Sequence, residues 1–272
     1  MGTEVEITTD ASEVAVAAAL EIVASLERRW SLVRPGSELS RLNRADGPVV
    51  ARPSTARAIG LALTGTRLTH GWFDPTRAVR AAMPARHGGV AVDDTTGLVD
   101  IPDGIELDLG GIAKGLTADI TAALLREGRA TQAGVTIGRD VRIRSDTRVL
   151  VEVVAPDGRP DPPALIGLCD GGIAVSGPMR RQGTDRPCHL IDPFTGRPAT
   201  APRVAAVVAT TAAGAEMLAT AAAIAPITDV IDFIEAQGAT AWLVENDGSM
   251  TTVGEPERFL VAAGWLDDRP TR

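Results

Sequence analysis

Two oxygen-bearing side chains stand four residues apart in the segment AEMLATA, at Glu216 and Thr220. If the segment is helical, both lie on one face of an otherwise apolar helix. A carboxylate that faces a protein core needs a partner, and Mg²⁺ prefers hard oxygen ligands of this kind. The spacing therefore indicates a metal site. A back-bonded threonine beside a glutamate that reaches solvent is the structural alternative.

A second segment, DLGGIAKG at 108–115, combines the glycine pair Gly110–Gly111 with Lys114 at the start of an apolar helical pattern. Free backbone amides at a helix N-terminus favour an anion, and Lys114 adds positive charge. The spacing fits neither the GxxxxGK[ST] phosphate loop nor the GxGxxG dinucleotide fingerprint. The segment indicates either an anion site of another kind or a plain glycine-rich start of a helix.

Two further segments place an aspartate on a turn. GWFDPT at 71–76 contains Asp74, and HLIDPFTG at 189–196 contains His189 and Asp192. An Asx turn next to an aromatic anchor would explain the first segment, and a histidine satisfied within the core would explain the second. Beside a phosphoryl-transfer centre, His189 would instead act as a base or stabilise charge.

Taken in chain order, these four segments and four shorter ones closely resemble the ApbE family, the FAD:protein FMN transferases. The shorter ones are MGT at the start, SELSRLN at 37–43, GRD at 138–140 and SG at 176–177. The collinear match runs from Met1 to about Phe259. The resemblance implies an α+β fold of the T-fold type.

The resemblance also implies an activity and its residues. Such a protein binds FAD with Mg²⁺, splits the pyrophosphate and places FMN through a phosphoester on a Thr or Ser hydroxyl of an acceptor flavoprotein, and AMP leaves. His189 would lie beside the pyrophosphate, and His189 or Asp192 would assist the acceptor hydroxyl. The metal would be held by the Gly111 carbonyl, Glu216 and Thr220. The FAD site would be lined by Met1, Trp72, Phe73, Asp74, Lys114 and Ile191.

The chain departs from the family pattern at several positions. Val33 stands where the family usually has an aromatic residue that stacks on the flavin. Arg139 replaces a glycine and would be strained if its φ were positive, Pro178 follows the SG pair, and Glu216 replaces an aspartate. The alternative function is therefore a diverged relative that binds or hydrolyses FAD without flavinylating a protein.

The elements that must position these segments can be read from hydrophobic periodicity. A capping pair, Asp10 and Glu13, precedes a helical stripe that ends at Trp30. A polar stretch at 31–48 is typical of a binding loop. Helices are also expected over 54–69, up to Gly128, over 213–224 and over 228–236, a hairpin at 90–101, and strands near 3–8, 133–144, 149–155, 164–175, 204–210, 240–245 and 250–253.

Irregularly mixed strands and helices with frequent hairpins favour an α+β fold with a largely antiparallel sheet and packed helices. We expect a single domain over 1–262 and a C-terminal tail at 263–272. The segment 188–199 is expected to be a strand that runs into a Pro/Gly turn.

Composition narrows the classes of partner. The 272 residues carry 27 Lys and Arg against 35 Asp and Glu, a net charge of −8, which argues against a nucleic-acid binder. Two Cys alone cannot build a disulfide framework or a four-ligand zinc site, and three His argue against a His-rich metal site. No charge-free apolar run of about 20 residues predicts a membrane span. The chain as given opens without a signal peptide or lipidation motif, so we expect a cytoplasmic protein.

Overall fold

The computed structural model describes residues 3–78, 89–93, 95–155, 163–178 and 190–266, and the structural statements below concern these residues.

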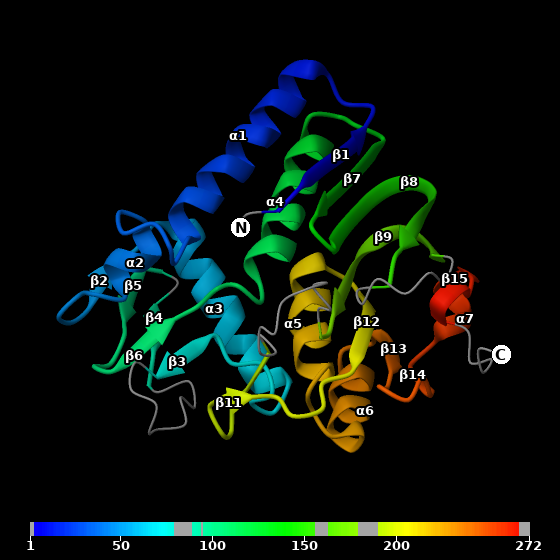
Figure 1. The fold of residues 1–272 in the computed structure, drawn as a ribbon. Helices are drawn as coiled ribbons and strands as arrows, with labels where there is room; N and C mark the ends of the chain where they lie inside the picture. Colours follow the sequence, from blue (N-terminus) through cyan, green and yellow to red (C-terminus); the bar gives the residue numbers. More distant parts are fainter. Residues whose placement is uncertain (1–2, 79–88, 94, 156–162, 179–189, 267–272) are drawn as a thin grey trace, which may run out of the picture.

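The fold is built on an eight-stranded sheet in which all the described pairings are antiparallel (Figure 1). The strand order is β1-β7-β8-β9-β12-β13-β14, and β15 pairs with β9. The strands are β1 (Val5–Thr9), β7 (Gln132–Ile137), β8 (Asp140–Val153), β9 (Ala164–Ser176), β12 (Val204–Ala209), β13 (Thr240–Val244), β14 (Met250–Val253) and β15 (Leu260–Ala262).

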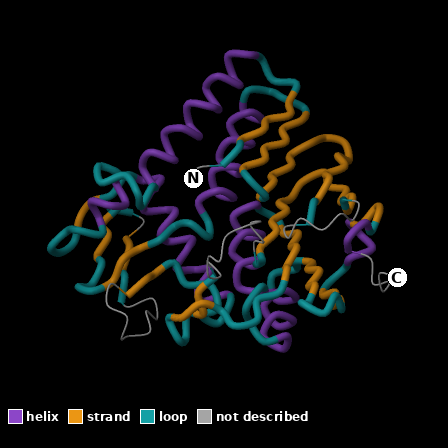
Figure 2. Tube along the Cα trace, viewed as in Figure 1, coloured by secondary structure: helices purple, strands orange, loops and turns teal. Residues whose placement is uncertain are grey.

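Seven helices accompany this sheet in the part of the chain that the structure describes. Helices α4 and α5 pack against the sheet, and α1 packs on α4. Figure 2 shows the longer helices gathered on one side of the strands, whereas α7 lies apart from them, beside β15. The helices are α1 (Glu13–Trp30), α2 (Glu38–Leu42), α3 (Pro53–Leu68), α4 (Ala113–Glu127), α5 (Ala212–Ala222), α6 (Ile227–Ala236) and α7 (Pro256–Phe259).

Short strands form three small sheets apart from the main one. They are β2 (Val49–Val50) with β5 (Leu98–Asp100) and β4 (Ala91–Asp93), β3 (Thr76–Ala78) with β6 (Ile105–Leu107), and β10 (Ile191–Asp192) with β11 (Arg197–Pro198). In Figure 1 the first two of these sheets lie beside α2 and α3, on the side of the helices away from the main sheet.

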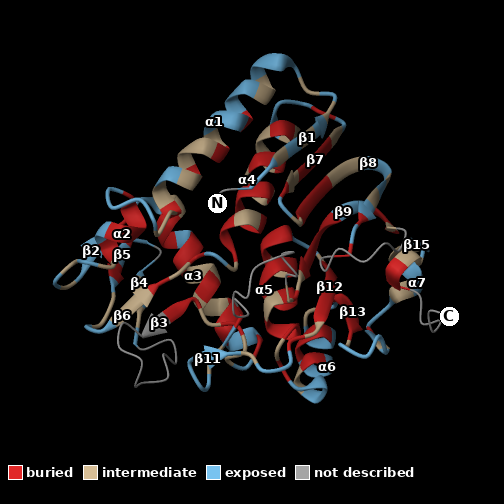
Figure 3. Ribbon diagram, viewed as in Figure 1, coloured by how far each residue is buried: buried red, intermediate tan, exposed pale blue. Residues whose placement is uncertain are grey.

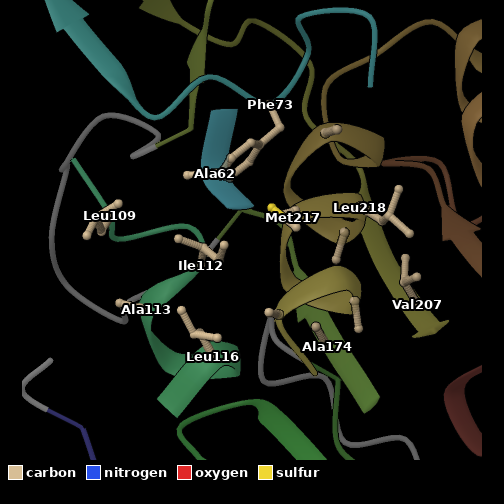
Figure 4. Close-up of a cluster of buried hydrophobic side chains, with 14 of the residues drawn as sticks. Ala62, Phe73, Leu109, Ile112, Ala113, Leu116, Ala174, Val207, Met217 and Leu218 are labelled. Carbon is tan, nitrogen blue, oxygen red and sulfur yellow. The ribbon is translucent and has the colours of Figure 1, made fainter. Parts of the chain in front are cut away.

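Alternating residues of the sheet feed two hydrophobic cores. In β12, Ala205 and Val207 belong to the core on the helix side, whereas Ala206 and Val208 belong to a second core on the opposite face. Both faces are therefore buried, as the red strands of Figure 3 show. The helix-side core places α4 and α5, the two helices that carry the predicted site, in direct contact (Figure 4).

The expectation of an α+β fold with a largely antiparallel sheet and packed helices is confirmed. Two strand predictions were wrong in their boundaries. Residues 133–144 are not one strand, because Gly138 with φ 65° turns the chain between β7 and β8. The break expected after residue 144 is instead a register shift within the continuous strand β8, which spans Asp140–Val153.

The first helix also begins differently from the prediction. Ser12, not Asp10, is the N-cap of α1, and its hydroxyl accepts a hydrogen bond from the Ala15 amide. The Asp10 carboxylate instead accepts from the amides of Thr131 and Gln132, at the start of β7. The Asp10 side chain therefore bonds residues far along the chain instead of capping the helix that the local pattern predicted.

The polar stretch at 31–48 contains a short helix that the sequence did not predict. Ser37 caps α2 by accepting from the Ser40 amide. Near the other end of the chain, Gly264–Leu266 form a 3₁₀ turn in which Trp265 is buried and donates to the Val153 carbonyl. This turn lies within residues expected to form a C-terminal tail.

Candidate active site

Two of the three predicted metal ligands, Glu216 and Thr220, lie on α5, a helix that packs against both α4 and the sheet. Thr211 caps α5 by accepting from the Gly214 amide. Glu216 is buried and Thr220, one turn later, is half-buried. As predicted, both lie on a helix dominated by alanine and other apolar residues.

The Glu216 carboxylate is satisfied by the N-terminal turn of α4. Its Oε2 atom accepts a hydrogen bond from the Gly115 amide at 2.8 Å, and its Oε1 atom accepts from Lys114 Nζ. The glutamate side chain therefore does not extend to solvent, and it is not unpaired in the core. Lys114 is the cation that balances its charge in this structure.

Lys114 also pairs with a second buried carboxylate. Its Nζ atom lies 2.9 Å from Oδ2 of Asp140, the first residue of β8. Two buried carboxylates thus share the ammonium group of Lys114. The sequence alone places Asp140 in the GRD motif but predicts no role for it. Its burial depends on how the turn between β7 and β8 packs, which no local sequence pattern predicts.

The sharing of one ammonium perturbs all three groups. Burial, and then the negative charge of Asp140, raise the pKa of Glu216 to about 7, against the lowering effect of Lys114 and of the Gly115 amide. Burial likewise raises the pKa of Asp140, against the lowering effect of Lys114. Burial alone would lower the pKa of Lys114, but Glu216 and then Asp140 hold it above its usual value. The cluster therefore favours a bound proton or a further cation.

The GWFDPT segment is packed more deeply than a ligand contact requires. Phe73 is 3% exposed and lies in the helix-side core (Figure 4). A Cβ atom at Gly111 would come within 2.8 Å of its Cε2 atom. Phe73 is therefore a buried anchor for the turn at Asp74, as the structural explanation of this segment expected. It packs against Gly111, one of the predicted metal ligands.

The neighbours of Phe73 take part in other contacts. Asp74 Oδ1 accepts from the Thr76 amide and hydroxyl, at 2.8 and 2.6 Å, which is the expected Asx turn. Trp72 Nε1 donates to Asp229 Oδ2 of α6 at 2.7 Å. The Trp72 ring meets the ring of Phe194 edge to face, with centroids 4.5 Å apart.

This ring contact brings two distant motifs together around a cavity. The cavity has a volume of about 240 Å³ and is lined by residues from the end of α3, from GWFDPT and from the turn of HLIDPFTG. The lining residues are Thr66, Arg67, His70, Gly71, Asp74, Pro193 and Phe194. An aromatic wall beside four polar side chains suits a flat heteroaromatic ligand.

The predicted residues of the HLIDPFTG segment are only partly described. Asp192 Oδ1 accepts from the Phe194 amide at 2.8 Å, so this carboxylate organises the β10–β11 turn. Ile191 is exposed by 49%. The predicted site residues Met1 and His189 lie outside the residues that the structure describes.

The SELSRLN segment has a scaffolding role that sequence reasoning missed. Buried Glu38 accepts from the Arg52 amide and from the Thr55 hydroxyl. The Asn43 side chain donates to the Leu107 carbonyl and accepts from the Leu107 amide. Because Leu107 directly precedes DLGGIAKG, these two bonds fix the start of the segment that carries Lys114.

Comparison with known proteins identifies the family. The ApbE family matches residues 1–244, most of the 272. The chain belongs to the ApbE family. The family pattern usually has a glycine where this ApbE chain has Arg139; here the positive φ falls on Gly138, so Arg139 shows no such strain.

Two curated relatives carry the name FAD:protein FMN transferase. The one from Vibrio cholerae serotype O1 (strain ATCC 39541 / Classical Ogawa 395 / O395) is 27% identical over 213 residues, which are 65% of this ApbE chain and 63% of the relative. The one from Klebsiella pneumoniae (strain 342) is 32% identical over 138 residues, 47% of this chain and 42% of the relative. The alignments thus span less than two thirds of either relative.

Solved structures share the fold over almost the whole chain. The ApbE protein of Thermotoga maritima MSB8 superposes with a TM-score of 0.81 at 24% identity, covering 99% of this chain and 97% of that one. The flavin transferase ApbE of Vibrio cholerae gives a TM-score of 0.78 at 23% identity, covering 96% of each chain.

Two features are absent from the residues that the structure describes: a metal-binding cluster of side chains and a membrane-spanning helix. No three His, Cys, Asp or Glu side chains gather there into a metal-binding group. None of the helices described is both long and apolar enough to cross a membrane.

Proposed function

We propose that this ApbE-family chain is an FAD:protein FMN transferase that uses Mg²⁺. The observation that carries the proposal is the contact between DLGGIAKG and AEMLATA at Lys114, Gly115 and Glu216. It joins a cation and a helix N-terminus to an oxygen-bearing helix face, which is the set of groups that pyrophosphate chemistry needs. The relatives named FAD:protein FMN transferase support the choice of substrate.

The residues present fit a hard cation. Glu216 keeps unused lone pairs on both carboxylate oxygens after bonding Lys114 and Gly115, and Asp140 leaves an excess of negative charge around that one ammonium. The contact of Gly115 with Glu216 sets a register between α4 and α5. Gly111 lies just before the N-terminus of α4, and Thr220 lies one turn beyond Glu216 on α5.

In this proposal, the Gly111 carbonyl, Glu216 and Thr220 hold Mg²⁺. The bound ion would supply positive charge beside the two phosphates of FAD. Glu216 is one methylene longer than the aspartate usual in the family, and its carboxylate is fixed by the Gly115 amide rather than left to adapt. The chain therefore holds the ligand in place before the ion arrives.

The proposed reaction exchanges the phosphoanhydride bond of FAD for a phosphoester bond to the acceptor. The bond from the FMN phosphorus to the bridging pyrophosphate oxygen breaks, and a bond from that phosphorus to a Thr or Ser oxygen of the acceptor flavoprotein forms. AMP leaves with the bridging oxygen, and the acceptor hydroxyl gives its proton to a base. His189 is the proposed base, with Asp192 shaping the turn three residues later.

Lys114 is placed to stabilise charge during this exchange. An ammonium group has three N–H donors, and two of them face Glu216 and Asp140. The third is left for a phosphate oxygen, because the Lys114 side chain is 27% exposed. Its raised pKa keeps the group charged at neutral pH.

The cavity beside Trp72 and Phe194 is the proposed place for one ring system of FAD. Asp74 and the Phe194 ring line it, and Trp72 supports that ring from the side. Phe73 contributes by packing against Gly111 rather than by touching the ligand. Met1, Ile191 and Lys114 complete the proposed FAD-binding set.

One observation favours the alternative, an FAD-hydrolysing relative without a protein acceptor. Val33 is 90% exposed at the position where the family usually has an aromatic residue. Without that ring, one face of the flavin has less cover.

Cys169 is an exposed free thiol, which fits the proposed cytoplasmic location, where thiols stay reduced.

Release of AMP from FAD tests the proposal. With Mg²⁺ and an acceptor protein, AMP is expected to accumulate, and with EDTA it is not. Calorimetric titration without metal should show tighter binding of FAD than of FMN, because the proposed contacts address both the rings and the pyrophosphate. Equal AMP release in EDTA would refute the metal assignment, and equal affinity for FAD and FMN would refute the dinucleotide site.

A further inference from the structure

The first residue of α5 is wedged between backbone atoms of two other elements. A Cβ atom at Gly115 of α4 would lie 2.4 Å from the Ala212 carbonyl oxygen. A Cβ atom at Gly172 of β9 would lie 2.3 Å from the Ala212 nitrogen. Only glycine permits approaches this close. The start of α5 is therefore held from two sides, and Glu216 follows one helical turn later.

A half-buried carboxylate of α4 holds the same point from a third direction. Asp119 Oδ1 accepts from the Ala212 amide and Oδ2 accepts from the Ala213 amide, both at 2.9 Å. These amides belong to the first turn of α5, where helical partners are missing and negative charge is favoured. Asp119 thus caps a helix other than its own.

Asp119 is itself held by an arginine of the sheet. Arg142 Nε lies 3.0 Å from Asp119 Oδ1. A second nitrogen of Arg142 lies 2.5 Å from Asp170, whose side chain is 62% exposed. The carboxylate of Asp119 is therefore fixed by two helix amides on one side and by a guanidinium from β8 on the other.

The two links between α4 and α5 form one regular pattern. Gly115 bonds Glu216, and Asp119, four residues later, bonds Ala212, four residues earlier. One turn of α4 is thus matched to one turn of α5 in antiparallel register. Any shift of α5 along its axis breaks both links together.

We propose that Asp119 is a positioning residue that sets where the Glu216 carboxylate lies. It acts through the rigid first turn of α5 and touches neither FAD nor the metal. Its consequence for metal binding rests on the function proposed above, whereas its effect on the position of Glu216 does not.

The Gly115 amide is a direct reporter of that position. It belongs to the first turn of α4, and the acceptor described for it is Glu216 Oε2. The neighbouring Leu116 amide bonds the Ile112 carbonyl within the same turn and serves as an internal control. Residue-resolved hydrogen exchange of the metal-free protein, well below its melting temperature, reads both amides at once.

The decisive variant is Asp119→Asn, which keeps the size of the side chain but offers one acceptor oxygen in place of two. We expect exchange of Gly115 to accelerate by about tenfold or more, while Leu116 stays within about twofold of wild type. Asp170→Asn is the matched control, because it removes the charge of the other carboxylate that pairs with Arg142, whereas the first amides of α5 bond Asp119. It should leave both amides unchanged.

Mn²⁺ titration followed by electron paramagnetic resonance gives the second readout. Asp119→Asn should weaken Mn²⁺ binding by about tenfold, and Asp170→Asn should not change it. If wild type binds no Mn²⁺ with or without FAD, the metal part of the proposed function fails, and Gly115 exchange still decides the role of Asp119.

Wild-type Gly115 exchange in Asp119→Asn would overturn the proposal. If that variant does not fold, Asp119→Glu takes its place, because it keeps the charge and both acceptor oxygens but is longer by one methylene. Gly115 should then exchange faster than in wild type, and an unchanged rate would overturn the proposal equally.

Discussion

Lys114 donates to Glu216 across 102 positions of sequence, and this ion pair joins the N-terminal turn of α4 to the buried face of α5. The cost of burying a carboxylate on an apolar helix predicts a cation at Glu216. The structure supplies that cation as an ammonium group, which Asp140 shares. A metal at this point would join an existing charge network.

Removal of the ammonium should therefore destabilise the fold as well as weaken FAD binding. Lys114→Met leaves two buried carboxylates without their ammonium partner, and we expect a loss of about 3–5 kcal/mol in the free energy of unfolding. The double variant Lys114→Met/Glu216→Gln should recover part of this loss, because it leaves one orphaned carboxylate. Urea unfolding measures both variants. A Lys114→Met protein as stable as wild type would show that the ion pairs are not held in solution.

Glu216 itself should be required for cleavage of FAD. Glu216→Gln keeps an oxygen for the Gly115 amide but loses the negative charge that a metal needs. We expect AMP release with Mg²⁺ to fall by about 100-fold, beyond the usual effect of losing a supporting residue. Circular dichroism checks the fold of the variant.

Glu216→Asp restores the residue usual in the family and tests the length of the side chain. A shorter carboxylate suits octahedral Mg²⁺ but must withdraw from the Gly115 amide, which the glutamate reaches at 2.8 Å. We expect activity equal to or above wild type if α5 moves to follow the shorter side chain. Normal cleavage by Glu216→Gln in the same assay would remove Glu216 from the metal site.

The ring contact between Trp72 and Phe194 should matter for ligand binding more than for folding. Phe194 is 37% exposed and lines the cavity. Phe194→Ala should weaken FAD affinity by about tenfold, the value of an aromatic contact of about 1.4 kcal/mol. Phe259→Ala, at the end of α7, is a control for loss of an aromatic ring elsewhere. Calorimetric titration with FAD measures both affinities. Equal FAD affinities for Phe194→Ala and Phe259→Ala would contradict the assignment of this cavity to FAD.

Asp10 provides a pH-dependent link between the N-terminal strand and β7. Hydrogen bonds from the Thr131 hydroxyl and then from the Gln132 amide lower the pKa of Asp10 from 3.8 to about 2. Because the folded-state pKa lies below the unfolded value, the stabilisation is complete above pH 4 and disappears as the pH falls towards 2. Asp10→Asn should therefore melt below wild type at pH 6, and the gap should close near pH 2.

The control for this prediction is Asp103→Asn, which changes an exposed loop aspartate. It should follow wild type at every pH. A gap between Asp10→Asn and wild type that stays constant from pH 6 to pH 2 would contradict the assignment of these hydrogen bonds to the ionised side chain.

Local patterns predicted the elements well where packing follows periodicity. The stripe that ends at Trp30 and the helix that ends before Pro226 both appear as expected, because their apolar faces are set by spacing alone. The cap of α1 was misassigned because Asp10 finds its partners 121 and 122 positions later. No local pattern carries such information.

The site shows the same division. Spacing correctly placed Glu216 and Thr220 on a helix, and the glycines of DLGGIAKG before one. The Asx turn at Asp74 followed from its own neighbours. The roles of Asp119 and Asp140 depend on how α4, α5 and β8 meet, so a single sequence gives no sign of them.

The most direct test of the account follows both halves of FAD in one experiment. The protein is incubated with FAD, Mg²⁺ and a candidate acceptor, AMP is quantified, and the acid-precipitated acceptor is analysed by tandem mass spectrometry. The account predicts AMP in equal amount to FMN that is covalently bound through phosphate to a Thr or Ser side chain. AMP matched by free FMN would instead identify an FAD hydrolase, and intact FAD with no AMP under any of these conditions would contradict the proposed transfer.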